Sequence, residues 1–492
     1  MSDVEGCPGG LDLLQAALRC PRHVWRLLRE AIRIALPPLV GFPLKYFLLL
    51  LLVLCWSATL IAQSPPILPS EYSARTDRKV VPYPATPPAT GPAGSIITDP
   101  SFGSRIARVT DARSDPKQAG RSLFSPSSSE QNPWNKTSTM FYVNTAGGSF
   151  VLYDFDPMTM KSHPVKSPNL PWTDEPQFSY GHANILYGMV RRSAVFQQYD
   201  VSTGKVSDVN IVSKCVKLQA SDSAGSPTVS ADDNRFMATV GPMQDKNYIV
   251  YVYDRSQGCR WYNTQTGEVG GQWGPKGRIS APDRFLVHNA RMAKSGKFVY
   301  ITRGSSSVGK GWVVWEVDSL NVDACQHGCS GHHVSGFSHI VGPSNIGHPL
   351  DLWVRPLNHL ASPSPIVAGL EPAKNFWYDS HYSWSNVDPN DTAPVCFSTY
   401  RPTNPDTPGT PLLVTGPWEN EIDCAETDGK GSKVWRFAHT YSTARNGFWS
   451  TPRGNVSQDG RFFMFTSDWE DQLGKQPNGQ RYRTDVFIIE LK

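Results

Sequence analysis

Residues 455–492 have the sequence NVSQDGRFFMFTSDWEDQLGKQPNGQRYRTDVFIIELK, and this unit indicates the fold most clearly. A polar turn at residues 458–460 comes early in it, and the Asp-Gly step supplies a residue that tolerates positive φ. Two runs rich in aromatic and β-branched residues follow, at 461–467 and 484–491. Such runs are typical of half-buried strands, so we expect two strands joined by an irregular loop.

The same unit recurs upstream in the chain. The clearest copies have a small residue, a polar turn, a basic residue, a phenylalanine and an apolar run. The copies lie at 230–239 (SADDNRFMAT) and 293–302 (AKSGKFVYIT), with weaker ones at 132–144 and 175–189. A strand that runs into a turn follows at 153–159, 199–204 and 262–267. Self-similarity at roughly forty to sixty residues, with several strands per repeat and no helical periodicity, is typical of a β-propeller.

The sequence therefore predicts an all-β fold, a seven-bladed β-propeller, and six or eight blades fit only slightly worse. The candidate blades lie at 132–161, 177–206, 228–269, 288–322, 339–365, 381–437 and 455–491. Residues 105–110 (RIARVT) precede the first blade as a lone strand. We expect this strand to close the ring by pairing into the last blade, because closure removes open sheet edges.

The composition fits a β-rich protein outside the cytoplasm. The 492 residues include 41 prolines, 40 glycines and 15 tryptophans, and only 18% of them are charged. The whole chain carries 47 basic and 43 acidic residues, a net charge of +4, and without residues 1–62 the counts are 41 and 39. A nearly neutral domain argues against nucleic acid as its main partner.

The chain begins with a predicted targeting region, residues 1–62. Residues 11–36 carry five arginines among apolar residues, and residues 46–62 (YFLLLLLVLCWSATLIA) are seventeen uncharged residues preceded by Lys45. The run reaches the lower length limit of a membrane-spanning helix, about 17 residues, and also resembles the apolar part of a signal peptide. A membrane anchor through residues 46–62 and a cleaved signal peptide are both open. Either one places the large C-terminal part outside the cytoplasm, in the periplasm or the extracellular space.

A proline-rich stretch at residues 63–94 is expected to be an extended linker, and residues 95–492 to form the propeller domain. Six of the nine cysteines lie in that domain. An even number of cysteines in an oxidising compartment suggests disulfides. Pairing of nearest neighbours gives Cys215–Cys259, Cys325–Cys329 and Cys396–Cys424, one of several possible connectivities.

One local cluster combines cysteine with histidine. Cys325 and Cys329 lie close in sequence to His327, His332 and His333. Thiolate and neutral imidazole bind transition metals, so a zinc site is one interpretation. The spacing of the two cysteines differs from that of common zinc knuckles, and a short disulfide-closed loop is the other interpretation.

Polar residues are predicted where the innermost strands of the blades converge on a central funnel. Gln177, Asn289 and Asn455 are candidate ligand-binding side chains there, and Arg453 is a candidate to neutralise an anionic group. The histidines His288, His339 and His381 are candidate ligands of a divalent metal. The alternative is that His288 and His381 are structural and bond to neighbouring blades.

Six tryptophans fall in predicted turns or at strand ends: Trp134, Trp172, Trp384, Trp418, Trp449 and Trp469. Their faces suit stacking on sugar rings, and packing at the blade edges is the alternative. The sequence contains no GxSxG, P-loop or GxGxxG motif. These absences argue against an appended hydrolase domain of the nucleophile-elbow type and against a phosphate-binding loop.

The repeated unit, clearest at 457–462 (SQDGRF) and 293–298 (AKSGKF), resembles the blades of TolB-like and WD40-like bacterial propellers. The likeness covers most of residues 105–492.

Residues 105–110, His288, His381 and the TSDW stretch at 466–469 are also similar in kind to oligogalacturonate lyases. This second resemblance implies seven blades, a manganese ion held by histidines and a glutamine in the funnel, and a histidine base for β-elimination.

Two functions are therefore expected. The first is an exported binding or interaction protein whose partner is an acidic oligosaccharide or an envelope protein, the latter held at the rim. The alternative is metal-dependent cleavage of acidic oligosaccharides. In that case His288, His339 and His381 would bind manganese or calcium, His439 would act as a base, and Arg453 would neutralise the substrate carboxylate.

Overall fold

The computed structural model describes residues 68–126, 131–172, 176–280, 284–304, 311–325, 329, 331–344, 351–367, 379–384, 387–401, 412, 414–431, 433–445, 447–479 and 481–492. The predicted signal or anchor at 46–62 and His327 of the cysteine–histidine cluster lie outside these residues. Within the described ranges, no helix is both long enough and apolar enough to span a membrane.

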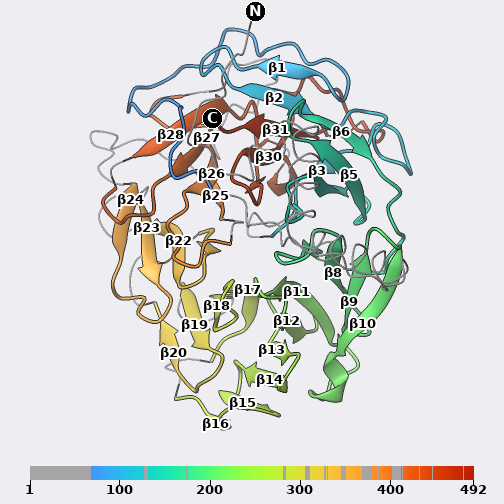
Figure 1. The fold of residues 1–492 in the computed structure, drawn as a ribbon, viewed down its shortest axis with the longest axis vertical. Helices are drawn as coiled ribbons and strands as arrows, with labels where there is room; N and C mark the ends of the chain where they lie inside the picture. Colours follow the sequence, from blue (N-terminus) through green and yellow to red (C-terminus); the bar gives the residue numbers. More distant parts are fainter. Residues whose placement is uncertain are drawn as a thin grey trace, which may run out of the picture. The chain divides into compact units, whose positions relative to one another are not determined.

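The strands form seven antiparallel sheets arranged as blades around a centre (Figure 1). Blade 1 consists of β3 (Leu123–Phe124), β4 (Met140–Thr145), β5 (Phe150–Asp156) and β6 (Lys161–Pro164), and blade 2 of β7 (Gln177–Phe178), β8 (Ile185–Val190), β9 (Val195–Asp200) and β10 (Lys205–Ile211). Blade 3 consists of β11 (Ser223–Val229), β12 (Arg235–Gly241), β13 (Ile249–Asp254), β14 (Gly258–Asn263), β15 (Glu268–Gly271) and β16 (Gly277–Arg278). Blade 4 consists of β17 (Val287–Met292), β18 (Phe298–Arg303), β19 (Trp312–Glu316) and β20 (Val322–Ala324).

The remaining three blades follow in chain order. Blade 5 consists of β21 (Val334–Ser335), β22 (His339–Ser344), β23 (Asp351–Pro356) and β24 (Ser364–Val367), and blade 6 of β25 (Asp379–Ser383), β26 (Val395–Tyr400), β27 (Glu421–Ala425) and β28 (Val434–His439). Blade 7 consists of β29 (Gly454–Val456), β30 (Phe462–Ser467), β31 (Asp485–Glu490), β2 (Arg105–Arg108) and β1 (Ile96–Thr98). Two short 3-10 helices, η1 (Val212–Lys214) and η2 (Phe448–Ser450), lie in loops.

The predicted seven-bladed propeller is confirmed, and each candidate blade corresponds to one sheet. The expected closing strand is also confirmed, because β2 pairs with β31 and aligns Ile106 with Ile489. Arg105 adds an ion pair to Glu490, with 3.2 Å between Nη1 and Oε2. The two strands come from opposite ends of the domain and lie side by side in blade 7 (Figure 1).

The repeated sequence unit forms a turn that is capped by its own side chains. Ser457 Oγ accepts a hydrogen bond from Phe462 N (3.0 Å) and donates one to Asp459 Oδ1 (2.6 Å). Ser230 Oγ makes the equivalent bonds, since it donates to Asp232 (2.5 Å) and accepts from Arg235 N (2.9 Å). Short polar side chains that bond the nearby backbone favour turns over regular structure. The recurrence of serine and aspartate in the repeat therefore has a structural cause.

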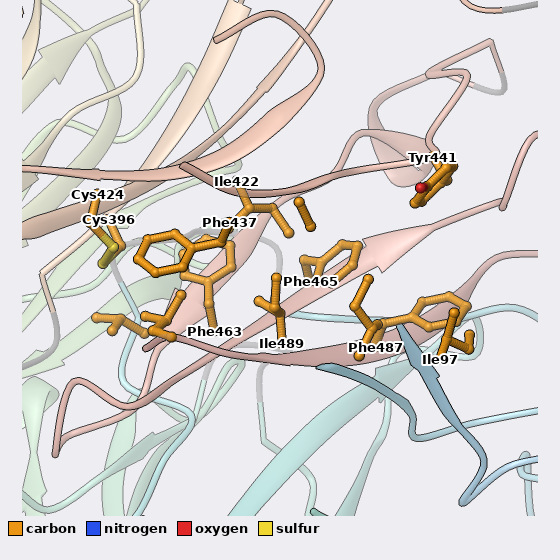
Figure 2. Close-up of a cluster of buried hydrophobic side chains, with 14 of the residues drawn as sticks. Ile97, Cys396, Ile422, Cys424, Phe437, Tyr441, Phe463, Phe465, Phe487 and Ile489 are labelled. Atoms are coloured by element: carbon orange, nitrogen blue, oxygen red, sulfur yellow. A yellow bond between two sulfur atoms is a disulfide. The ribbon is translucent and has the colours of Figure 1, made fainter. Parts of the chain in front are cut away.

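A dense apolar core joins blades 6 and 7 (Figure 2). Blade 6 contributes Phe437 and Ile422, and blade 7 contributes Phe463, Phe465 and Phe487, all of them fully buried. The rings of Phe465 and Phe487 stack with 5.8 Å between their centres. Burial of such side chains contributes roughly 1.5–3 kcal/mol each, so this interface is a main source of stability.

Three disulfides confirm the pairing of nearest neighbours: Cys215–Cys259, Cys325–Cys329 and Cys396–Cys424. Cys396 and Cys424 lie directly opposite each other on β26 and β27. The cluster at Cys325 and Cys329 is therefore a disulfide-closed loop, the second of its two interpretations.

Part of the stretch predicted as a linker packs against blades 6 and 7. The Tyr72 hydroxyl donates to Gly460 O (2.9 Å), and the Tyr83 ring stacks on His439 with 4.2 Å between the ring centres. Farther along, Trp469 Nε1 donates to Pro88 O (2.7 Å). Residues 68–94 thus form a strap, a segment that covers the outer strands of these two blades.

A buried ion pair holds this strap. The Arg436 guanidinium donates to both carboxylate oxygens of Glu421 (2.6 and 2.8 Å) and to the backbone oxygens of Asp77 (2.9 Å) and Lys79 (2.7 Å). Asp423 lies beside Glu421 and is fully buried. Burial, and then the neighbouring Glu421, raise the pKa of Asp423 well above its ordinary value. The strap is therefore anchored to a group of charges that water does not reach.

Candidate functional site

Polar residues of the innermost strands connect each blade to the next. Val229 N donates to Gln177 Oε1 (3.3 Å), Met292 N to Thr228 Oγ1 (3.1 Å), and Val456 N to Ser383 Oγ (3.0 Å). In each pair the acceptor belongs to one blade and the donor to the following blade. These bonds satisfy buried backbone groups of the innermost strands and link adjacent blades.

Two of the predicted ligand-binding residues belong to this ring of hydrogen bonds. Gln177 accepts a hydrogen bond from Val229 of blade 3. Asn455 Nδ2 donates to Gln131 O (3.0 Å), and Gln131 lies shortly before Trp134, which forms a β-bridge with Phe141 of β4. The third, Asn289, accepts a hydrogen bond from Ser226 Oγ (3.1 Å). All three side chains lie on or beside innermost strands, as predicted, and their contacts link adjacent blades.

Arg453 lies immediately before β29 and is fully buried. Three aromatic rings surround its guanidinium: the ring centres of Phe448, Trp449 and Phe124 lie 4.5, 4.8 and 5.9 Å from its central carbon. Nη2 makes a long hydrogen bond of 3.4 Å to Trp449 O. Among the residues that the structure describes, Nε and Nη1 have no hydrogen-bond partner, and no carboxylate forms an ion pair with Arg453.

The Arg453 site contains a buried positive charge that has no negative partner among the described residues. Burial lowers the pKa of Arg453 to about 9, because the charged form loses its hydration. Aromatic faces attract a cation, yet each such contact contributes only about 0.5–2 kcal/mol. Buried charges are normally paired with an opposite charge. The two unpartnered donors are therefore suited to an anionic group such as a carboxylate, which a guanidinium binds with two parallel hydrogen bonds.

His381 lies on β25 beside the arginine. Its ring centre is 4.1 Å from that of His332 and 5.6 Å from that of Tyr400, and its Nε2 is 3.4 Å from Thr451 Oγ1. Burial, followed by the nearby charges of His332 and Arg453, lowers the pKa of His381 well below its ordinary value. The imidazole is therefore neutral near pH 7 and adds hydrogen-bonding capacity to the site without a second full charge.

The other predicted metal ligands lie in separate environments. His288, on β17, bonds Asp245 with 2.8 Å between Nδ1 and Oδ1. His339 begins β22, the second strand of blade 5, and its Nδ1 lies 3.0 Å from Asp391 Oδ2. Over the described part of the chain, no three or more histidine, cysteine, aspartate or glutamate side chains are grouped to hold a metal ion. As placed among the described residues, these histidines do not form a metal centre.

The structure does not bring His439, the predicted base, to Arg453. His439 ends β28, the outermost strand of blade 6, where its Nε2 donates to Pro82 O (3.2 Å). Burial under the strap lowers the pKa of His439 to about 4. Its ring packs between Tyr83 and Phe102, with ring centres 4.2 and 5.1 Å away.

Several residues of the Arg453 site did not stand out in the sequence. Phe448 and Phe124 lie in or beside loops without a periodic pattern, and Tyr400 reads as an ordinary strand residue. His332 stood out only as a neighbour of the cysteines. The adjacent aromatics Phe448 and Trp449, just before Arg453, are the one local signal that could have indicated an aromatic cage.

The fold and the site together define a class of protein, a seven-bladed β-propeller whose innermost strands carry polar side chains that bond the neighbouring blades. No protein-family model matches the sequence, and no curated protein matches it. Among solved structures, the chain is similar to an oligogalacturonate lyase in complex with manganese, with a TM-score of 0.50 and 12% identity over 83% of this chain and 98% of that one. The expected likeness to such propellers is confirmed for the fold.

Other solved propellers resemble the chain more weakly. An oligogalacturonate lyase from Vibrio parahaemolyticus has a TM-score of 0.49 and 10% identity, over 80% of this chain and 96% of that one. TolB from Acinetobacter baumannii has a TM-score of 0.30 and 14% identity, over 59% and 63% of the two chains.

Proposed function

We propose that the protein is an exported binding protein whose propeller holds an anionic ligand, through a carboxylate, at Arg453. The observation that carries the proposal is a fully buried arginine with two donors that have no partner among the described residues. A ligand carboxylate would supply the opposite charge that the site lacks. His381 and Tyr400 would line the same site and contribute to its selectivity for shape.

Access to this site involves the η2 turn. Phe448 and Trp449 lie over the guanidinium, and 43% and 39% of their surfaces remain exposed. Gly447 before them has a φ of 78°, a conformation that favours glycine. A small displacement of this turn would open Arg453 to a ligand. The same two rings would then flank the bound carboxylate and exclude water from it.

Export is part of the proposal and rests on the three disulfides. Disulfides persist in oxidising compartments and are rare in the cytosol. Cys215–Cys259 ties the segment between blades 2 and 3 to β14 of blade 3, and Cys396–Cys424 links β26 to β27 of blade 6. Acidic oligosaccharides are the first ligand class to test, because they carry carboxylates on rings that aromatic side chains can stack against.

The test compares trigalacturonate with the neutral galactotriose by titration calorimetry on the full-length protein. We expect the acidic sugar to bind at least tenfold more tightly than the neutral one, and Arg453→Met to abolish this preference. Arg461→Met is the matched control, since Arg461 lies on the same blade with 46% of its side chain exposed. Unchanged binding of the acid by folded Arg453→Met would refute the proposal.

The alternative function, metal-dependent cleavage of acidic oligosaccharides, stays a prediction. The same samples distinguish it, because β-elimination yields an unsaturated product that absorbs ultraviolet light. Each sample should be incubated with and without added manganese and calcium. Product formation that depends on the added metal would identify a lyase, and binding without product supports the binding protein.

A further inference from the structure

A second concave site lies at the seam between blades 7 and 1. It is a cleft of about 410 Å³, within the usual range of roughly 300–1,000 Å³ for small-molecule sites. It is lined by the turn between β4 and β5 and by an excursion between β30 and β31, residues 474–479 and 481–483. Trp449 also lines the cleft.

The lining of this cleft has a particular chemistry. The residues that line it include Trp449, Tyr482, Gln476, Asn478, Arg481 and Thr145. They combine two aromatic rings with amides, a hydroxyl and one guanidinium, and among the described residues no carboxylate lines the cleft. Amide and hydroxyl groups both donate and accept hydrogen bonds, and aromatic faces cover apolar C–H surfaces. A sugar ring presents this same pair of surfaces, hydroxyls at its edge and C–H groups on its face.

Hydrogen bonds and ring packing within the protein hold the lining of the cleft in place. In the excursion, Gln476 N donates to Arg481 O (2.9 Å) and Arg483 N donates to Gly474 O (2.7 Å). The Trp449 indole packs against Phe124, with 5.2 Å between the ring centres. A site that is already formed loses less conformational entropy when a ligand binds.

We infer that this cleft is a binding site for a neutral sugar ring, with Trp449 as its stacking surface. The cleft shares Trp449 with the carboxylate site, since Trp449 also contacts the Arg453 guanidinium. Its other stacking and hydrogen-bonding residues, Tyr482, Gln476 and Asn478, lie between β30 and β31, outside the aromatic cage of Arg453. One arginine at the exposed rim, Arg481, adds a donor for hydroxyls without making the cleft strongly cationic.

The test screens the full-length protein on an array of neutral oligosaccharides, followed by titration calorimetry with the best binder. We expect saturable binding that Tyr482→Ala and Trp449→Ala each weaken at least tenfold and Gln476→Ala several-fold. Met243→Ala, an exposed residue on the loop after β12, is the surface control and should change nothing.

Two results would overturn the inference. The first is the absence of saturable binding by any neutral oligosaccharide on the array. The second is binding that survives both Tyr482→Ala and Trp449→Ala in folded protein, which would place the sugar elsewhere. Failure of the carboxylate proposal would give a different result. Acidic and neutral sugars would then bind the wild-type protein with equal affinity, and Arg453→Met would change neither affinity.

Discussion

The guanidinium carbon of Arg453 lies 4.5 Å from the centre of the Phe448 ring, close enough for the ring to act as its main electrostatic partner. Ring faces offset only part of the free energy lost when a full charge leaves water. The folded protein therefore keeps this arginine at a net cost in stability. Binding sites often retain such groups because the ligand, once present, satisfies them.

Replacement of Arg453 by methionine should stabilise the protein while it removes binding of the acid. An apolar side chain of similar length suits the aromatic cage, and the unpaired buried charge disappears. We expect the free energy of unfolding to rise by about 1 kcal/mol or more. Urea denaturation of wild type, Arg453→Met and the exposed Arg461→Met measures this effect. A loss of stability in Arg453→Met would show that the arginine has a structural partner.

Replacement of Arg436 should have the opposite effect. The Arg436→Met change leaves Glu421 buried without its two hydrogen bonds and releases the backbone oxygens of the strap. Breaking a buried pair in this way costs about 3–5 kcal/mol. Chemical denaturation should show that loss, with Arg461→Met within about 0.5 kcal/mol of wild type as the control. Equal stability of the two variants would contradict the role assigned to the pair.

The pH dependence of stability should change when Asp423 is replaced by asparagine. The pKa of Asp423 is raised in the folded state, so the folded protein favours its protonated form. Its contribution to stability is complete below the ordinary pKa, about 4, and is lost as the pH rises toward the folded value. Asparagine stays neutral, so Asp423→Asn should gain stability relative to wild type between pH 4 and 8, by at least about 1.4 kcal/mol.

Thermal unfolding across this pH range measures the difference. Asp154→Asn, on the exposed side of β5, controls for the removal of one acidic residue. A constant gap between Asp423→Asn and wild type at all pH values would refute the assignment.

The three disulfides should differ in their contribution to stability. In the chain-entropy treatment, a cross-link stabilises more when it closes a longer loop. Cys215–Cys259 spans 44 residues and Cys325–Cys329 spans 4. Replacement of both cysteines by serine should then cost about 4 kcal/mol for the first pair and about 2 kcal/mol for the second. Melting temperatures of the two double variants give the order, and the reverse order would argue for strain or residual structure instead.

The closure of the ring gives a fifth prediction. Ile106 on β2 is fully buried, whereas Ile96 on β1 is 40% exposed. A charged side chain at position 106 is buried without a partner, so Ile106→Asp should cost about 4 kcal/mol and promote aggregation through the edge of β31. Ile96→Asp is the matched control and should lie within about 0.5 kcal/mol of wild type. Light scattering and denaturation measure both effects.

The blades were predictable from the sequence because their signal is local and repeated. Ser457 and Ser230 each cap a turn through bonds within a few residues, so the motif directly reports the geometry. The closing strand was predictable because an unpaired sheet edge has to be covered. The pairing of the cysteines followed because each pair lies within one blade or its loops.

The site was less predictable because it depends on contacts between distant segments. Arg453 was identified from its position, yet its cage combines Phe124 from β3 of blade 1 with Phe448 from η2, in the loop before blade 7. His439 could have been placed by its order in blade 6, since a fourth strand lies at the outer edge. Proline-rich composition predicts an extended conformation. It does not indicate whether the extended chain packs on the propeller, as residues 68–94 do.

The pairing of β2 with β31 means that the propeller can close only after β31 has been synthesised. Arg105 and Glu490 are 385 residues apart in the chain, so the first partner of this pair is made long before the second. Until β31 has been synthesised, β1–β2 and β29–β30 are two separate strand pairs, because β31 is the strand that joins them. A prematurely terminated chain would therefore expose an unfinished sheet that chaperones and proteases can recognise. Only a chain that includes β31 can therefore close the ring.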